Sequence, residues 1–411
     1  MVMVHIISTS SCRFEGPWPQ LGSSPMLVLH ELPLQIPAGT QLSPELSLLR
    51  QDASRAVESG SDTSAMNKFD VHLQFASALL KSHAIFPDTE LEELICIAVV
   101  NMAFFCQQSC ERLVRKAYLE GSKEAWASSG QYNKKAIGLL KFLVSSRIAS
   151  TTSLLGMVQT YIKCWTLSQQ LSVVIFSLSK LRSQICGSSK ADVDRYERLL
   201  GFQESDIKDL AKASLLYARL CIGCRETCSQ LANTSLSSLC EPLCRYLDAL
   251  TFVLMSLDCY RNDECGKAIG MLEAATDCLA KGLISNKQLK LIQETKKLKG
   301  KIASKFRELK SEGSKLQTKI KLFKRSTPIE RGELHPFLQS TLEDFIIPLV
   351  MLLHHRYVNT NDKVFFQPVV NQREELTHSW PQGKTPELVG TAWFFDGEQL
   401  KENSPVNSEY F

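Results

Sequence analysis

The sequence predicts a mainly α-helical protein. From Lys68 onward, apolar residues recur at intervals of three and four over most of the chain, which is the periodicity of one helix face. Segments with this periodicity follow one another through short polar or glycine-containing connections, as in helical hairpins. Of the 411 residues 44% are hydrophobic, and only 15 are proline, so the chain has an ordinary globular composition and enough apolar surface for a sizeable core.

The first 65 residues differ from the rest. Residues 14–19 (Phe-Glu-Gly-Pro-Trp-Pro) are rich in turn formers, and the apolar runs over 26–34 are interrupted or followed by Pro33 and Pro37. Prolines in such runs favour extended pieces or short edge strands. We therefore expect an N-terminal extended segment with a small β element, packed on the helical body.

Residues typical of helix beginnings and ends indicate where the following helices begin and end. Asp88 and Ser122 are typical N-cap residues, and Gly121 is a typical helix terminator. Residues 267–275 have the alternation of small and large residues seen in tetratricopeptide helices, but no 34-residue period repeats it, so the hairpins do not form a regular array. The pattern predicts one helix from 68 and others at about 88–119, 123–145, 152–181, 192–200, 204–233, 236–259, 263–283 and 335–357.

Residues 286–325 carry an unusual charge. They hold 14 Lys and Arg against three Glu, a net charge of +11, whereas the whole chain carries only +4. Apolar residues keep a helical spacing here, so we expect a long amphipathic basic helix with a break near Gly313. Such a helix forms a solvated outer face, or contacts acidic lipid headgroups or an acidic partner. The candidate contact residues are Lys296, Lys297, Lys299 and Lys301.

Fourteen cysteines are many for a chain of this length. Most fall in amphipathic helical segments, and we expect no secretion signal, so they are predicted to be buried free thiols. A second interpretation stays open, because one group lies at helical spacing on two neighbouring helices and would gather around a metal ion or form a redox pair. This group consists of Cys221, Cys224, Cys228, Cys240 and Cys244. No histidine lies nearby, and no metal or cofactor is predicted.

Motifs of common active sites are absent from the sequence. It has no GxxxxGK[ST] phosphate loop, no GxGxxG after a strand, no GxSxG elbow and no HExxH zinc motif. His354 and His355 are adjacent without an acidic ligand at helical spacing, which indicates a surface or interface pair. The weak net charge argues against nucleic-acid binding. The residues predict a non-enzymatic, cytoplasmic protein without a transmembrane segment, which binds partners through a helical surface.

Three stretches resemble the Bro domain of ALIX-type proteins. Residues 361–369 (Asn-Asp-Lys-Val-Phe-Phe-Gln-Pro-Val) are similar to the Asn-Asp-x-Ile-Tyr segment that closes that domain. Residues 265–280 are similar to its Gly-x-x-Ile-Ala-Arg-Leu helix, and 124–143 to its hairpin helix. The order and spacing agree over about 65–395. The N-terminal proline-rich turns and the Phe-Gln-Pro-Val sequence look most like the fungal PalC subgroup.

This resemblance implies a boomerang-shaped domain with a small N-terminal sheet and tetratricopeptide-like helical hairpins. Its limits would be 1–65 for the N-terminal segment, 66–395 for the Bro domain with its closing segment 358–395, and 396–411 for a tail. The family binds the C-terminal amphipathic helix of an ESCRT-III filament subunit. PalC-like members support alkaline-pH signalling that leads to proteolytic activation of a PacC-type transcription factor, and they are recruited to endosomes or the cell cortex.

The resemblance also implies which residues bind. Together they are expected to form one exposed apolar face, although the alternatives of a metal or redox cysteine cluster and of a membrane-contacting adaptor for other endosomal partners stay open. The closing segment is expected to pack on the domain, and its family tyrosine is Phe365 here, which puts regulation through a hydroxyl in doubt. The implied partner-binding residues are Lys123, Ala125, Val174, Ile175, Phe176, Leu210, Ala213 and Leu216. The implied packing residues are Asn361, Asp362, Phe365 and Val369.

Overall fold

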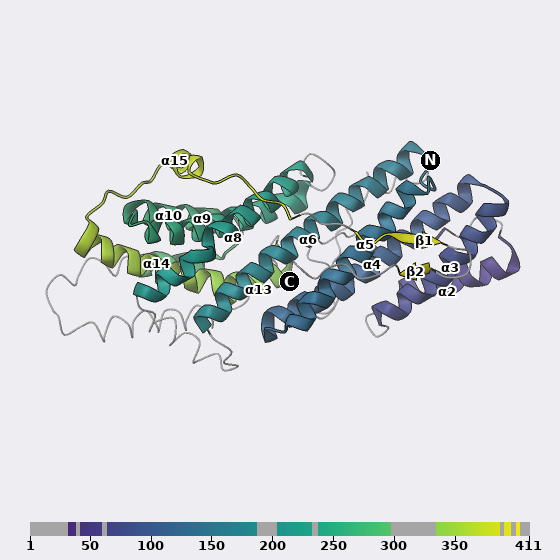
Figure 1. The fold of residues 1–411 in the computed structure, drawn as a ribbon, viewed down its shortest axis with the longest axis horizontal. Helices are drawn as coiled ribbons and strands as arrows, with labels where there is room; N and C mark the ends of the chain where they lie inside the picture. The colour runs from purple at the N-terminus through teal and green to yellow at the C-terminus, as the bar shows by residue number, and fades with distance from the viewer. Residues whose placement is uncertain are drawn as a thin grey trace. The chain divides into compact units, whose positions relative to one another are not determined.

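Helices make up most of the computed structural model of the protein (Figure 1). The mainly α-helical prediction is therefore confirmed. The helix expected at 192–200 and most of the basic segment 286–325 fall outside the described residues. The structure describes residues 32–37, 42–59, 64–186, 204–231, 237–296, 334–386, 390–395 and 400–402.

The chain forms two compact units, which we describe one at a time. Unit 1 comprises Met1–Gln169 and Glu387–Phe411, and unit 2 comprises Gln170–Pro386. The division falls inside helix α6 (Thr152–Cys186), so each unit contains about half of that helix. The domain limits inferred from the sequence stay a prediction.

Capping residues set the helix ends of unit 1. Asp88 accepts a hydrogen bond from the Glu90 amide at the start of α4, and Ser122 accepts one from the Ala125 amide at the start of α5. Gly121 lies between these helices with a φ of 72°, the left-handed conformation that terminates α4. Consecutive helices pack against each other in the order α2, α3, α4 and α5. Their bounds are α2 (Pro44–Glu58), α3 (Ala65–Ile85), α4 (Thr89–Glu120) and α5 (Lys123–Ser145).

The N-terminal segment departs from the extended structure expected for it. Residues 44–58 form α2, because Ser43 caps the helix, Pro44 occupies its first turn, and Leu46 and Ala53 are buried at helical spacing. Residues 32–37 are irregular and contain no strand. Residues 26–31, the rest of the predicted β element, lie outside the described part of the chain.

A two-stranded antiparallel ribbon forms instead near the C-terminus, in unit 1. Strand β1 (Trp393–Phe395) pairs with β2 (Leu400–Glu402), with Trp393 opposite Glu402. Strand β1 packs on α5, and the Trp393 ring lies 6.2 Å from the ring of Phe69. An aromatic side chain of the tail therefore packs against α3.

Helices α8, α9 and α10 pack in sequence to form the centre of unit 2, with α14 against α10. The Tyr260 and Tyr357 rings stack with their centroids 4.1 Å apart, which joins α9 to α14. The bounds are α8 (Glu204–Leu231), α9 (Ser237–Arg261), α10 (Cys265–Ala280), α11 (Asn286–Lys296), α13 (Pro336–Thr341), α14 (Ile347–Thr360) and α15 (Arg373–His378), with π-helical turns η2 (Leu342–Ile346) and η3 (Asn361–Phe365).

The helix predicted at 335–357 is realised as α13, η2 and α14 in succession. The π-helical turn immediately precedes α14, in whose first turn the missing amide of Pro348 is tolerated. By length and composition the helical stretch Pro336–Phe365 could cross a membrane, but 72% of its most apolar window is buried within the protein. That burial is typical of a core helix.

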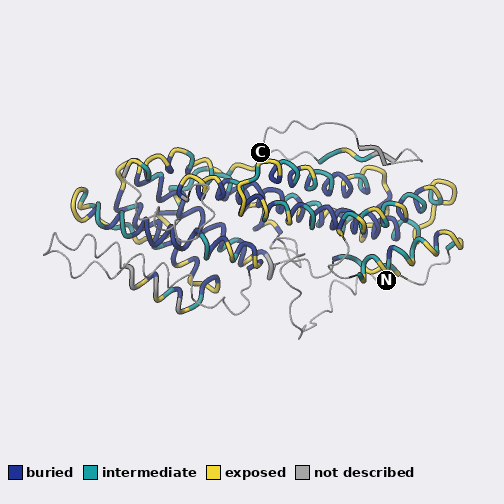
Figure 2. The backbone as a smooth tube through the Cα atoms, turned by 90° about the horizontal axis from the view of Figure 1, so that it is seen from below, coloured by how far each residue is buried: buried dark blue, intermediate teal, exposed yellow. Residues whose placement is uncertain are grey.

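Each unit contains a central helix that is buried on all sides over a long stretch. In unit 1 every residue of α4 from Leu94 to Gln107 is buried, and in unit 2 every residue of α9 from Tyr246 to Leu257 is buried. Figure 2 shows this as continuous dark blue along the inner helices, with exposed residues on the outer turns. On the helices that surround these buried stretches, the exposed side chains lie mainly on the outward face.

Candidate functional site

The outward face of α8 is partly covered by residues 366–386, an extended segment interrupted by the short helix α15, which we call the strap. The Lys384 amide donates to the Arg219 carbonyl at 2.8 Å, and the Arg219 guanidinium donates to the Gln382 carbonyl at 3.2 Å. A Cβ atom on Gly223 would lie 2.5 Å from the Lys384 carbonyl oxygen, so the close approach depends on glycine. The strap therefore contacts α8 through its backbone.

One turn before this crossing, the same face of α8 is open. Leu215 and Leu216 are 39% and 46% exposed, and they lie three to four residues before Arg219 on the helix surface. Lys212, one turn further, is also exposed and forms an ion pair with Asp209. We call Lys212, Leu215 and Leu216 the open α8 face. It suits an apolar partner, as does the exposed pair Val364 and Phe366 at the end of η3.

The N-terminal end of the strap is fixed by the segment that resembles a Bro-domain closure. Asn361 is buried, and its side chain donates to the Gln367 carbonyl and accepts from the Gln367 amide. The Gln367 side chain in turn accepts from the Gly266 amide at 2.9 Å, at the start of α10. Cβ atoms on Gly266 or Gly270 would collide with strap carbonyl groups. The hydrogen bonds of Asn361 and Gln367 thus hold the N-terminal end of the strap against α10.

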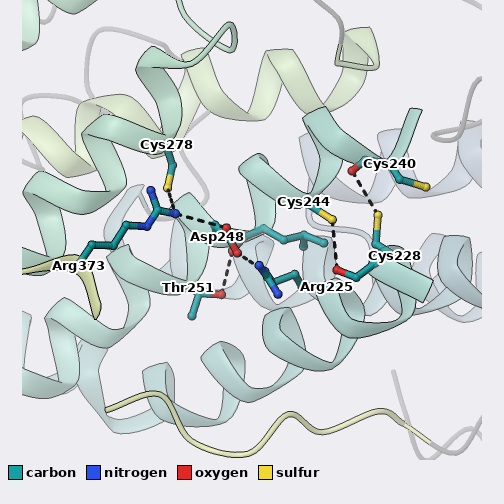
Figure 3. A network of polar contacts seen from close by, with 10 residues as sticks. Arg225, Cys228, Cys240, Cys244, Asp248, Thr251, Cys278 and Arg373 are labelled. Atoms are coloured by element: carbon teal, nitrogen blue, oxygen red, sulfur yellow. Dashed lines mark hydrogen bonds and ion pairs between the residues drawn. The ribbon is translucent and has the colours of Figure 1, made fainter. Parts of the chain in front are cut away.

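A partly buried polar network, centred on the buried Asp248, holds the middle of the strap (Figure 3). Asp248 of α9 forms ion pairs with Arg225 of α8 and, at 3.6 Å, with Arg373 of α15. Arg373 also donates to the Cys278 thiol at 3.3 Å and lies over the Phe252 ring. Burial raises the pKa of the Asp248 carboxyl, and the two guanidinium groups oppose that shift.

Burial corrects part of the predicted partner-binding face. Val174 and Leu210 are 1% and 3% exposed, and Ile175 and Ala125 are also buried, so the expectation that these four residues lie on an exposed patch is wrong. The reason is packing: Val174 lines a cavity of about 10 Å³ with residues of α8 and α9. These side chains therefore contribute to the core of their units.

The other predicted residues remain accessible to different degrees. In unit 2, Leu216 is exposed, Ala213 is half-buried, and Phe176 is half-buried with the Lys180 ammonium 5.0 Å from its ring centroid. Lys123 is exposed in unit 1. Leu215 belongs to the same surface and was missed, although it is adjacent to Leu216 in the sequence.

The other residues that were predicted to pack the closing segment are partly or fully accessible to solvent. Phe365 and Val369 are half-buried, and Asp362 is exposed. Phe366 has a φ of 52° and is 73% exposed, an uncommon conformation for a non-glycine residue. Of the basic candidates, Lys296 ends α11, and Lys297, Lys299 and Lys301 lie outside the described residues.

His354 differs from the predicted surface histidine. It is buried, and its Nε2 atom lies 3.6 Å from Glu273 on α10, a partner distant in sequence. His355 is half-buried and bonds to Asn359 at 3.0 Å. Helical spacing cannot reveal a carboxylate supplied by another helix.

The described cysteines are free thiols, and all except Cys244 are buried, as predicted. Cys221 and Cys224 lie in the core of unit 2, where burial raises the pKa of both thiols. Cys228 and Cys244 come close together at the α8–α9 interface, with Cys240 beside them (Figure 3). No group of side chains suited to a metal ion occurs among the described residues.

Comparison with known proteins identifies relatives of this chain. Residues 89–411 match a family described as a family of unknown function, DUF5355. The uncharacterized protein YGR122W of Saccharomyces cerevisiae is 31% identical over 379 residues, which cover 88% of this chain and 90% of the yeast protein. The family match begins at the first residue of α4, so it includes the open α8 face, the polar network and the strap. The chain belongs to the DUF5355 family.

Proposed function

We propose that the protein is a non-enzymatic adaptor of the Bro-domain type, which binds the C-terminal amphipathic helix of an ESCRT-III filament subunit. The observation that carries this proposal is the open α8 face, where two adjacent leucines stay exposed on the helix that the resemblance assigns to the contact. An amphipathic helix offers a continuous apolar stripe to such a surface. The other described residues that are exposed on α8 are polar or charged, for example Lys208, Asp209 and Glu226.

Further parts of the proposal rest on the resemblance of 124–143, 265–280 and 361–369. They are the boomerang shape, the small N-terminal sheet, recruitment to endosomes or the cell cortex, and a role in alkaline-pH signalling of the PalC kind. In this role the adaptor brings the filament and other signalling components together before a PacC-type transcription factor is cleaved. Binding, without catalysis, is all that this function requires of the chain.

The proposal is tested by titrating the full chain with a peptide of the ESCRT-III C-terminal helix in a calorimeter. Leu216→Asp should weaken binding at least tenfold, about 1.4 kcal/mol, because it places a charge in the apolar contact. Leu48→Asp is the matched control, since Leu48 is 59% exposed on α2 and should not affect binding.

Two results would contradict the proposal. Equal affinities of the wild type and Leu216→Asp would exclude the open α8 face as the contact. No binding of the peptide to the wild type would exclude this class of partner. Val174→Asp is unsuitable as a probe, because it would place a charge in the core and destabilise the fold.

A further inference from the structure

Three thiols meet where α8 packs against α9. Cys228 of α8 donates a hydrogen bond to the Cys240 carbonyl, with its sulfur 3.4 Å from the oxygen. The Cys228 thiol also interacts with the thiols of Cys240 and Cys244 on α9. Figure 3 shows the three side chains together at this interface, beside the Arg225–Asp248 pair. The cluster therefore offers a sulfur on each helix within reach of the other.

Cys244 is the accessible member of the cluster. It is the described cysteine that is not fully buried, and the Ser229 hydroxyl lies 3.7 Å from its sulfur. The hydrogen bond from Cys228, with smaller contributions from Ser229 and the Arg225 guanidinium, lowers the pKa of the Cys244 thiol to about 7. A substantial fraction is thiolate at neutral pH, and thiolate is the reactive form. The Cys228 thiol also lowers the pKa of Cys240, but Cys240 is fully buried.

Cys228 is suited to the complementary role. It is fully buried, and donation of its one S–H proton within the cluster, together with burial, raises its pKa, so it stays protonated. Solvent oxidants reach it less readily than Cys244, but the Cys244 sulfur is its direct neighbour. Low-pKa, accessible cysteines next to a second cysteine are typical of redox-sensing pairs.

We propose that Cys244 and Cys228 are a peroxide-sensitive dithiol that closes to a disulfide between α8 and α9. The Cys244 thiolate attacks one oxygen of hydrogen peroxide, the O–O bond breaks, and hydroxide leaves and takes up a proton to form water. The product is a sulfenic acid on Cys244. The Cys228 sulfur then attacks the Cys244 sulfur, the S–S bond forms, and the S–O bond breaks, releasing water with the Cys228 proton. The two thiols together lose two electrons to the peroxide.

This inference is independent of the proposed adaptor function. The cluster lies on the α8–α9 interface, whereas the open α8 face lies about three turns earlier on α8. A peptide titration therefore does not test whether the disulfide forms, and a peroxide experiment does not test peptide binding.

The chain is convenient for the test. Trypsin would release residues 226–245 as one peptide that contains all three cluster cysteines, and residues 220–225 as another that contains Cys221 and Cys224. We would treat the folded full chain with hydrogen peroxide, block remaining thiols with iodoacetamide in denaturant, and analyse both peptides by mass spectrometry. Residues 226–245 should lose two hydrogen atoms, with one thiol alkylated, and fragmentation should map the bond to Cys228 and Cys244. Peptide 220–225 should stay fully alkylated.

Variants separate this pair from the other possible pairings. Cys240→Ser should keep the disulfide, whereas Cys244→Ser and Cys228→Ser should abolish it, and circular dichroism would verify that each variant is folded. The proposal is overturned if the wild-type peptide 226–245 keeps three alkylated thiols after peroxide treatment. It is also overturned if fragmentation maps the bond to Cys240, or if Cys244 stops at a sulfinic or sulfonic acid without a disulfide.

Discussion

Two stretches of one helix face have opposite surroundings. On α8, the turn around Gly223 lies directly under the strap, and the turn around Leu216 is open. The covered turn has no side chain at the point of contact, so backbone meets backbone, while the open turn has two large apolar side chains. Among the described residues, the strap contacts this face at Arg219 and Gly223, whereas Leu215 and Leu216, one turn earlier on the helix, are exposed.

The largest expected contrast is between Leu210 and Leu216. Leu210→Asp should lower the free energy of unfolding by about 4 kcal/mol or more, because it buries a charge in the core. Leu216→Asp, on the open turn, should change it by less than about 0.5 kcal/mol. Urea unfolding followed by circular dichroism would measure both. Similar losses in the two variants would show that Leu216 is part of the core.

Removal of the network that fixes the strap should have the next largest effect. Asp248→Ala leaves Arg225 and Arg373 without their shared carboxylate. Because both guanidinium groups are more than a third exposed, water replaces part of the lost interaction, and the cost should be about 2 to 3 kcal/mol. Thermal unfolding would measure the loss. Asp209→Ala is the matched control, since Asp209 forms an exposed ion pair worth less than about 1 kcal/mol. Equal losses would mean that Asp248 does not anchor the strap.

In unit 1, side-chain hydrogen bonds hold residues 32–37, and they involve a histidine that makes the stability of the protein depend on pH. Asn101 bonds to both backbone groups of Leu34 and to His72, and burial lowers the pKa of His72 to about 4. Between pH 6.5 and 4 the unfolded chain takes up a proton that the folded chain excludes, so the stability should fall with decreasing pH, by about 3 kcal/mol at the acid end. Above pH 6.5 the imidazole is neutral in both states.

His72→Gln should flatten that dependence. The measurement is the free energy of unfolding in urea at several pH values for the wild type and the variant. Parallel curves for the two proteins would assign the acid instability to other groups.

The smallest expected effect concerns the glycine contact itself. Gly223→Ala should destabilise the protein by about 2 kcal/mol, because the added methyl group collides with the Lys384 carbonyl. Gly156→Ala is the control, since nothing lies within 4 Å of its Cβ position, and alanine should stabilise α6 by up to about 1 kcal/mol. Thermal midpoints that shift in the same direction for both variants would contradict a tight strap contact.

Much of the helical framework could be predicted from the sequence, because its signals are local. Asp88, Gly121 and Ser122 fix helix ends through their own backbone and side-chain geometry. The burial of Val174 and Ile175 could not be predicted, since α6 is apolar around most of its circumference there and its spacing does not mark an outward face. That property depends on neighbours distant in sequence.

The strap is an intermediate case. Glycines inside the predicted helices, at 138, 223, 266 and 270, are a signal of close backbone approach that sequence reasoning did not use. Each of them contacts an extended part of the C-terminal region in the structure. A glycine inside a helix indicates where another backbone segment can come close to that helix. Which segment comes close is known only from the structure.

The backbone hydrogen bonds under these segments have a consequence for amide exchange. The Lys384 amide donates to the Arg219 carbonyl in unit 2, and the Thr391 amide donates to the Lys134 carbonyl in unit 1. Both residues lie outside the helices and strands, where amides without a partner exchange rapidly with deuterium. Lys384 and Thr391 should exchange slowly, and each would report by a single resonance on whether its own unit keeps the segment docked.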